Sequence, residues 1–327
     1  MKITLRHGSG GEETTKLIQD IFAAHFHNDI LNKMEDAAVL PEIKGSPVFT
    51  SDSFVVQPLF FPGGDIGRLA VCGTVNDLAC MGANPLYLTA SFILETGLEW
   101  ETLDKVVASM AETAGEAGVK IVAGDTKVVE GNGGLYINTA GIGLRPSDCK
   151  ISAANLQKGD ALIVTGTLGD HHATILTQRL EMETTLQSDC APLNRLVAEI
   201  LDAGIPVHTI RDITRGGLAT VANELGAASG CRINLEEEKL PVSDAVKGLS
   251  GILGLDPLTM GNEGKMLLAV SAKEAEKALQ VLKKNRYGRA AAVVGEVAEG
   301  KGVYLHTALG SFRKILPLRG EGLPRIC

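Results

Sequence analysis

Short apolar runs typical of strands alternate with amphipathic helical patterns along most of the chain. Residues 87–94 indicate a buried strand, residues 101–118 an amphipathic helix and residues 121–123 another short strand. The alternation resumes with a strand over residues 161–165 and continues to about residue 305. Chains of this kind pack helices onto sheets. We therefore predict an α/β (α+β) fold, and 327 residues suffice for two domains.

A break in the pattern near residue 150 predicts where the two domains meet. Residues 144–147, Leu-Arg-Pro-Ser, interrupt the alternation, and it restarts at Lys158. We predict a first domain over residues 1–150, a second over residues 151–310 and a mobile tail over residues 311–327.

Charge and cysteine usage exclude several classes of protein. The net charge is −8 and no basic block occurs, which argues against a nucleic-acid partner. No apolar run is long enough to span a membrane, and the first residues lack the apolar core of a secretory signal. The six cysteines form no Cys-x-x-Cys pair, so zinc and iron–sulfur sites are not supported. These features predict a cytoplasmic location.

The chain ends in a cysteine, Cys327, after a segment that suits a movable strap. Residues 316–323 mix proline, glycine and charge, and about ten extended residues reach roughly 30 Å. The terminal carboxylate should raise the pKa of the thiol, whereas Arg325 should lower it. The alternative is a frayed tail with an incidental cysteine.

Several aspartates lie beside predicted strands or inside an apolar helix. Asp52 and Asp125 each follow a short strand pattern, and Asp77 interrupts the apolar helical pattern over residues 65–81. A buried carboxylate needs a partner, and converging carboxylates repel one another unless cations lie between them. Oxygen ligands of this kind favour Mg²⁺, which commonly accompanies nucleotide phosphates. The full set is Asp36, Asp52, Asp77, Asp125 and Asp212. Taken singly, each could equally be a solvated turn residue or a helix cap.

Two glycine-rich loops precede predicted helices and could approach an anion. Gly8-Ser9-Gly10-Gly11 comes before a helical pattern over residues 14–25, and a second loop begins at Gly166. Neither is followed by the Gly-Lys-Ser/Thr of a P-loop. A flexible arm at the first loop and a plain strand–turn–helix connection at the second explain the same residues.

Nine motifs together make the chain resemble the HypE family of hydrogenase maturation proteins. This family belongs to the superfamily of aminoimidazole ribonucleotide synthetase, thiamine-monophosphate kinase and selenophosphate synthetase. The motifs are His7–Gly11, Thr50–Ser53, Pro58–Gly64, Val75–Ala79, Ala123–Val129, Thr165–His171, Arg211–Gly217, Asn262–Lys265 and Pro324–Cys327. Two departures are Glu35, where aspartate is frequent, and Cys80, where methionine is common.

The resemblance implies a specific reaction on the last residue. A carbamoyltransferase, HypF, would load Cys327 with a carbamoyl group. The protein would then use ATP to dehydrate this thiocarbamate to a thiocyanate, S-cyanocysteine. A HypC–HypD scaffold would carry the resulting cyanide ligand to the iron of a nickel–iron hydrogenase. The resemblance also implies a two-domain aminoimidazole ribonucleotide synthetase-like fold and a homodimer.

Candidate roles follow from the motifs and from the chemistry of phosphoryl transfer, which depends on positioning and charge neutralisation. Lys127 is a candidate for stabilising charge near the acceptor oxygen, and Glu263 is a candidate base. The candidate Mg²⁺ ligands are Asp36, Asp52, Asp77 and Asp212. The candidate nucleotide contacts are Gly8, Ser9, Gly10, Gly11, Asn76, Asp125 and Thr126. As structural alternatives, Lys127 could be a surface ion-pair member and Glu263 a turn residue.

Two other functions fit part of the sequence. A small-molecule phosphotransferase of the same superfamily would need the acids but not Cys327. A carrier that displays a modified cysteine without catalysis would need Cys327 but would not bind Mg–ATP, and the retained acids argue against it.

Overall fold

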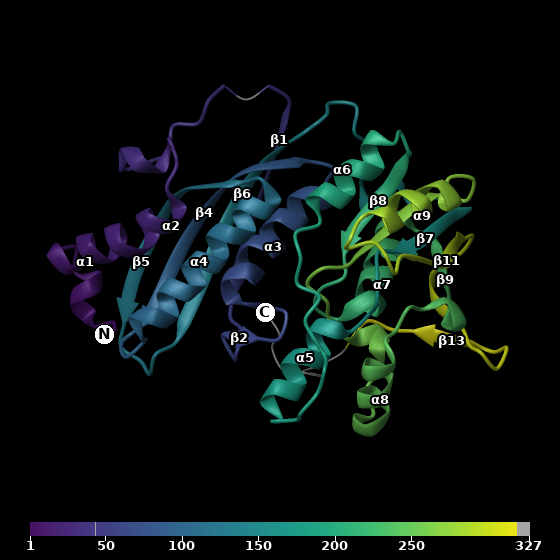
Figure 1. The fold of residues 1–327 in the computed structure, drawn as a ribbon. Coiled ribbons are helices and arrows are strands. Elements are labelled where there is room, and N and C mark those ends of the chain that lie inside the picture. The colour runs from purple at the N-terminus through teal and green to yellow at the C-terminus, as the bar shows by residue number, and fades with distance from the viewer. Residues whose placement is uncertain (43, 319–327) are drawn as a thin grey trace.

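A computed structural model describes residues 1–42 and 44–318, which form a mixed helix and sheet fold (Figure 1). The first half is built on a four-stranded sheet of order β1-β6-β4-β5. Its strands are β1 (Ser46–Phe54), β4 (Asn84–Glu95), β5 (Lys120–Val129) and β6 (Leu135–Arg145). A two-stranded ribbon, β2 (Phe60–Phe61) with β3 (Gly64–Asp65), leads into the first long helix.

Helices α3 (Ile66–Cys80) and α4 (Trp100–Ala117) lie against one face of the four-stranded sheet (Figure 1). The Asp65 carboxylate accepts the backbone N–H groups of Gly67 and Arg68, which caps the start of α3. Gly82, with a φ of 70°, follows its end. Almost the whole of α3 is buried, because it also contacts the second half of the chain.

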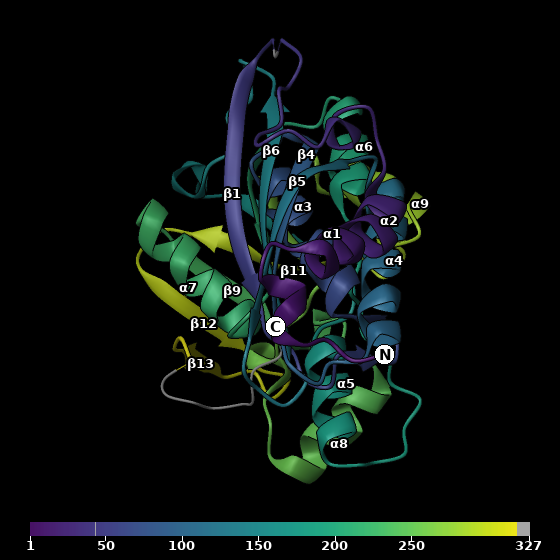
Figure 2. The same ribbon diagram turned by 90° about the vertical axis from the view of Figure 1, so that its left-hand side faces the viewer.

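The N-terminal segment lies beside β5, at one edge of the sheet, whereas β1 forms the other edge (Figure 2). The expected helix over residues 14–25 is continuous, with a wider π-helical turn in its middle. It comprises α1 (Glu12–Leu17), the π-helical turn Ile18–Ala23 and α2 (Ala24–Phe26).

The second half is built on a seven-stranded sheet of order β13-β12-β9-β11-β7-β10-β8. Its strands are β7 (Asp160–Val164), β8 (Val207–Asp212), β9 (Arg232–Glu236), β10 (Met266–Ser271), β11 (Ala292–Ala298), β12 (Gly302–His306) and β13 (Phe312–Ile315). Its helices are α5 (Asp170–Arg179), α6 (Asn194–Asp202), α7 (Gly217–Ser229), α8 (Asp244–Leu253) and α9 (Ala275–Lys284).

Alternate residues of the central strands point to two apolar layers, one on each face of the large sheet. Leu162 and Leu267 pack in the layer that holds α7, whereas Ile163 and Leu268 pack in the layer that holds α6 and α9. The second layer also includes Ala79 and Cys80 of α3, which joins the two halves through apolar contact.

Three expectations from the sequence need correction. Asp52 and Asp125 were expected to follow their strands, but both lie inside longer strands, β1 and β5. Residues 312–315, expected in the tail, form β13, which pairs antiparallel with β12 and buries Ile315. The rest of the predicted tail includes Cys327, which lies outside the described residues. The two sheets fall on either side of residue 150, but the proposed domain limits stay a prediction.

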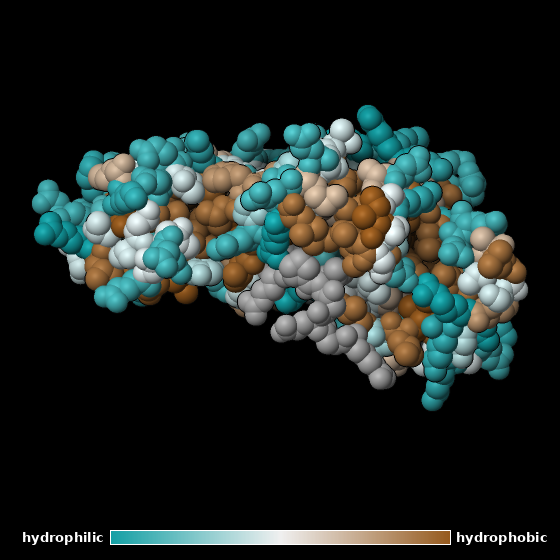
Figure 3. Space-filling view, turned by 90° about the horizontal axis from the view of Figure 1, so that it is seen from below, coloured by the Kyte–Doolittle hydropathy of each residue, from teal (hydrophilic) through white to brown (hydrophobic). Residues whose placement is uncertain are grey.

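Seen from below, hydrophilic side chains dominate the two ends of the molecule and apolar side chains reach the surface between them (Figure 3). Exposed apolar side chains include Phe60, Leu180 and Ile252. Scattered side chains of this kind are normal on protein surfaces. None of the described helices combines the length and apolarity that crossing a membrane requires.

Candidate functional site

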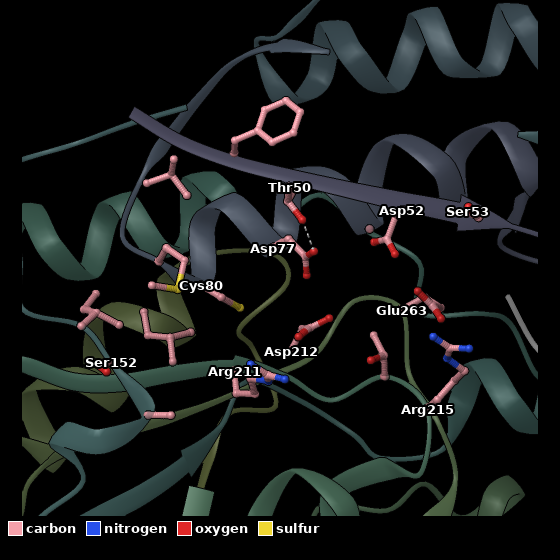
Figure 4. A pocket seen from close by; sticks show the side chains of 18 of the residues that line it. Thr50, Asp52, Ser53, Asp77, Cys80, Ser152, Arg211, Asp212, Arg215 and Glu263 are labelled. Carbon is pink, nitrogen blue, oxygen red and sulfur yellow. Dashed lines mark hydrogen bonds between the residues drawn. The ribbon is translucent and has the colours of Figure 1, made fainter. Parts of the chain in front are cut away.

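Four carboxylates from four separate parts of the chain line one cavity of about 530 Å³, which we call the acidic cavity. Asp52 comes from β1, Asp77 from α3, Asp212 from the end of β8, and Glu263 from the loop before β10. Figure 4 shows these side chains directed into the same space. The cavity therefore lies where β1 and α3 of the first half meet the second half.

Local structure explains why these carboxylates face the cavity. Asp52 lies on the face of β1 that packs toward α3, next to Gly73. Asp77 is the single residue between positions 69 and 80 that is not buried, so it interrupts an otherwise buried helix at the cavity. The Thr50 hydroxyl donates to the Asp77 carboxylate at 2.7 Å (Figure 4).

The electrostatics of the acidic cavity favour a bound cation. Burial, followed by repulsion from Asp77, raises the pKa of Asp52 and of Asp212 to about 6. Burial also raises the pKa of Asp77, although its hydrogen bond from Thr50 and the charge of Arg211 partly offset this. Each of these carboxylates would therefore be stabilised in its charged form by a positive ion.

Glu263 is the most enclosed of the four acids. It is only 4% exposed, and its Oε1 atom has no hydrogen-bond partner within the described structure. Burial, and then the neighbouring charges of Asp189 and Asp212, raise its pKa well above the usual value. Its backbone N–H donates to Asp189 at 3.2 Å. An orphaned buried carboxylate oxygen is a position where a ligand or a proton can be accommodated.

Arg211 and Arg215 add positive charge to the same cavity. Arg211 pairs with Glu224 at 3.2 Å. Arg215 lowers the pKa of Asp52, partly opposing the two larger causes. Arginines beside carboxylates suit the binding of an anion that carries its own cation, such as a metal-bound phosphate chain.

A second cavity, of about 380 Å³, lies at the β5 edge of the small sheet, and we call it the glycine-loop cavity. Gly8 and Gly10 line it, and Gly8 packs so closely on Val128 that no side chain would fit there. The other expected site residues on its wall are Asp36, Asp125, Thr126 and Lys127. Ser9 and Gly11 belong to the same exposed loop, which precedes α1.

Apolar side chains that the sequence did not single out form the rest of the glycine-loop cavity. Phe22, Phe26, Ile30 and Ile121 line it. The available signal was the apolar residues of the helix that follows the glycine loop, from Leu17 onward. An apolar chamber with glycines and charged groups at its wall has the composition of a small-molecule site.

Lys127 and Asp125 lie beside each other on β5. The Lys127 ammonium is 2.8 Å from the Asp125 carboxylate, and both side chains are more than half exposed. This ion pair was the structural alternative for Lys127. The contact lowers the pKa of Asp125.

Asn76 has a different placement from the expected nucleotide contact. It is buried, donates to the Ala191 carbonyl at 3.0 Å and accepts from the Leu193 backbone N–H at 2.7 Å. Its amide therefore joins α3 to the segment before α6 instead of lining either cavity.

The structure thus divides the expected residues into two groups. Asp52, Asp77, Asp212 and Glu263 meet in the acidic cavity, which includes β1, whereas Asp36, Asp125 and Lys127 meet in the glycine-loop cavity beside β5. Because β1 and β5 are opposite edges of the sheet, one chain does not bring the two groups together. Within residues 1–42 and 44–318, no three His, Cys, Asp or Glu side chains are arranged to hold a metal ion by themselves.

Comparisons with known proteins agree with this architecture. Residues 34–145 match the N-terminal domain, and residues 157–307 the C-terminal domain, of the AIR synthase related proteins. Carbamoyl dehydratase HypE of Escherichia coli is 49% identical over 335 residues, with 99% of each chain covered. The chain belongs to the HypE family. Carbamoyl dehydratase HypE of Rhodobacter capsulatus is 46% identical to this chain, and the match covers 100% of this chain and 98% of that relative.

Solved structures show the same fold. A HypE crystal structure in complex with ATP has a TM-score of 0.95 and 44% identity, with 99% of both chains covered. A HypE–HypF complex contains a chain with a TM-score of 0.81 and 46% identity, covering 92% of this chain and 99% of that one. These matches confirm the expected two-domain fold of this HypE family member.

Proposed function

We propose that this chain is an ATP-dependent carbamoyl dehydratase that converts a carbamoyl group on its own Cys327 to S-cyanocysteine, for hydrogenase maturation. The observation that carries the proposal is the convergence of four buried or half-buried acids in the acidic cavity. The names of the relatives, and the ATP bound in a related crystal structure, support the same reaction class.

The chemistry requires that a poor leaving group be converted to a good one. The carbamoyl oxygen attacks the γ-phosphorus of ATP, ADP departs, and the oxygen then leaves carbon as part of inorganic phosphate. Loss of both amide protons completes the C≡N bond. The thiocarbamate and ATP thus yield thiocyanate, ADP, phosphate and a proton.

The acidic cavity fits Mg²⁺ that arrives with nucleotide phosphates. Asp52, Asp77 and Asp212 are the candidates to hold the ion, and one or two of them would suffice, because Mg²⁺ uses one or two carboxylates together with phosphate oxygens instead of a complete protein cage. The raised pKa values of Asp52 and Asp212 and the unpartnered Glu263 Oε1 atom mark a cluster of acids that a cation would stabilise. When bound, the ion would neutralise charge on the phosphates.

Glu263 would remove a proton from the carbamoyl nitrogen. Its carboxyl group is buried beside Asp212, and its Oε1 atom has no hydrogen-bond partner in the described structure, which leaves that oxygen able to accept a proton. Lys127 would stabilise the negative charge at the phosphoryl acceptor, after leaving its ion pair with Asp125.

The glycine-loop cavity would hold the nucleotide itself. Its apolar wall, with Phe22 and Phe26, suits the adenine ring. Gly8 to Gly11 would approach the phosphates, and Asp36, Asp125 and Thr126 would contact the nucleotide or its metal. A cytoplasmic setting is part of this proposal, since the nucleotide and thiol chemistry both suit it.

A homodimer would unite the two cavities. Each chain presents the glycine-loop cavity at one edge of its sheet and the acidic cavity at the other, and the sheet face opposite α3 and α4 carries exposed apolar residues. Phe49 is 72% and Ile93 46% exposed there. Pairing of two such faces would bury this surface and place β5 of one copy near β1 of the other.

Two further partners belong to the proposal. A HypF-type carbamoyltransferase would load Cys327, which the existence of a HypE–HypF complex supports. A HypC–HypD scaffold would receive the cyanide for the hydrogenase iron.

Mass spectrometry of the C-terminal peptide tests the reaction directly. The full chain is first carbamoylated by its transferase and then incubated with ATP and Mg²⁺. We expect Cys327 to lose the mass of one water, and ATP to be consumed in equal amount. If the chain without Cys327 still consumed ATP with a free small-molecule substrate, the phosphotransferase would be favoured instead. Retention of the carbamoyl group would favour the carrier.

A further inference from the structure

A third cavity, of about 420 Å³, lies between the two halves of the chain and is rich in cations. Arg68 of α3 lines it from the first half, and Lys265, Arg286 and Arg289 line it from the second. We call it the cationic cavity. The glycine loop at Gly166, which the sequence suggested could approach an anion, forms part of its wall, whereas none of the candidate catalytic, metal or nucleotide-contact residues named from the sequence does.

The cations of this cavity outnumber the acids that neutralise them. Arg68 and Arg286 share one carboxylate, Glu116, and the Arg68 contact measures 3.0 Å. Lys265 pairs with Asp189 at 3.2 Å. These four cations have two carboxylates as ion-pair partners, and Asp170 adds a third acid near Lys265. Within the described structure Arg289 has no ion-pair partner, and it is exposed at the cavity.

Neutral groups on the wall suit an oxyanion as well. Gly166 and Thr167, from the glycine loop after β7, line the cavity beside Ser188. A side chain at position 166 would come within 2.7 Å of the Lys265 side chain, so glycine lets the lysine lie over the loop. Backbone near a glycine, hydroxyl groups and several cations form a typical phosphate environment.

We propose that the cationic cavity binds the phosphate group of a small anion. Several cations on one cavity wall favour a multiply charged group over a single carboxylate, and arginine has the planar fork that matches phosphate oxygens. The volume admits a molecule larger than phosphate itself. The site is separate from the acidic and glycine-loop cavities, so it does not depend on the proposed dehydratase reaction.

Phosphorus NMR with the full chain tests this site. Inorganic phosphate is titrated in magnesium-free buffer, where the acidic cavity repels it. We expect saturable binding that Arg289→Ala weakens by about tenfold, because a charge-assisted contact to phosphate is lost. Arg195→Ala, an exposed arginine on α6 away from this wall, serves as the matched control and should leave binding unchanged.

Two further arms separate the possible outcomes. Asp77→Asn should not alter phosphate binding, because Asp77 lines a different cavity. Parallel titrations with pyrophosphate and glycerol phosphate, neither of which carries a base for the glycine-loop cavity, distinguish free phosphate from a phosphate ester as the occupant. Absence of saturable binding by all three anions would overturn the proposal. So would equal binding by wild type and by an Arg289→Ala variant that circular dichroism shows to be folded.

Discussion

The acidic cavity and the glycine-loop cavity lie at opposite edges of one sheet and differ in their electrostatics. The acidic cavity gathers negative charge in a half-buried space, so the pKa values of Asp52 and Asp212 rise to about 6. The glycine-loop cavity combines an apolar chamber with the exposed ion pair between Lys127 and Asp125, whose pKa falls. Under the proposed function, the acidic cavity would bind a cation, whereas the glycine-loop cavity would bind the adenine base and supply a lysine. A reaction between ATP and a carbamoyl group needs both.

Asp77→Asn should have the largest effect, because it removes the carboxylate whose charge acts on both Asp52 and Asp212. We expect ATP-dependent thiocyanate formation to fall by about 10²–10³-fold, on the scale of a lost group that helps to neutralise transition-state charge. The measurement is cyanated peptide against time, with Mg²⁺ and ATP saturating.

Asp148→Asn, at an exposed position outside the cavity, is the matched control and should retain full activity. The melting temperature of Asp77→Asn should not fall, because the substitution relieves repulsion between acids. Full turnover in Asp77→Asn would remove the acidic cavity from the mechanism.

Recovery of activity on mixing two inactive variants tests whether the cavities cooperate between copies. Lys127→Ala alters only the glycine-loop cavity and Glu263→Gln only the acidic cavity. Each should be nearly inactive alone. In a randomly mixed homodimer, half the dimers carry one intact composite site of two, so about one quarter of wild-type activity should return.

Adding Phe49→Glu to both variants is the control for dimer formation. Phe49 is 72% exposed on the open sheet face, and a charge there should oppose pairing of two such faces. Rescue should then disappear, and light scattering should report a smaller particle. If co-expressed Lys127→Ala and Glu263→Gln chains stay inactive while forming dimers, the two cavities do not act on one substrate.

Asp36→Asn should reduce activity less than Asp77→Asn does. The difference compares the catalytic contribution of an acid in the glycine-loop cavity with that of an acid in the acidic cavity. Asp36 lies on the wall of the glycine-loop cavity and is exposed, so solvent screens its charge. We expect a loss of about tenfold or less in kcat/KM for ATP. A loss equal to that of Asp77→Asn would instead place Asp36 among the principal metal ligands.

Residue types and local patterns predicted much of the fold, because strand and helix periodicities are local properties. The helix around Asp77 was correctly anticipated, and the fold class is confirmed. The exact placement of Asp52 and Asp125 within their strands was not anticipated, because a strand that continues through polar residues gives no local sign of its end. Strand β13 was missed because its pairing with β12 stabilises a segment that has the composition of a tail.

The candidate site was predictable as a set of residues but not as two groups. Sequence patterns give the identity of Asp36 and Lys127, but only the sheet order shows that they lie across the sheet from Asp52 and Glu263. The hydrogen bonds that commit Asn76 to joining the two halves of the chain are long-range contacts, which no local pattern reports.

The smallest effect we predict is the pH dependence of stability that repulsion in the acidic cavity causes. Burial and then Asp77 raise the pKa of Asp52 and of Asp212 from 3.8 to about 6 in the folded protein. A folded-state pKa above the unfolded value gives stability that is complete at low pH and is lost as pH rises through the folded value. Wild type should therefore lose melting temperature relative to Asp77→Asn between about pH 4 and pH 7 in magnesium-free buffer.

The expected difference is a few degrees, since each kcal/mol corresponds to roughly 2–4 °C in a chain of this kind. Using the difference between wild type and variant removes the opposing contributions of acids elsewhere in the chain, such as Glu116, whose pKa is lowered. Asp148→Asn should follow wild type at every pH. A constant difference between wild type and Asp77→Asn across this range would mean that the acids of the cavity do not repel one another in the folded protein. Saturating Mg²⁺ with a nucleotide analogue should reduce the slope, because a bound cation stabilises the charged carboxylates.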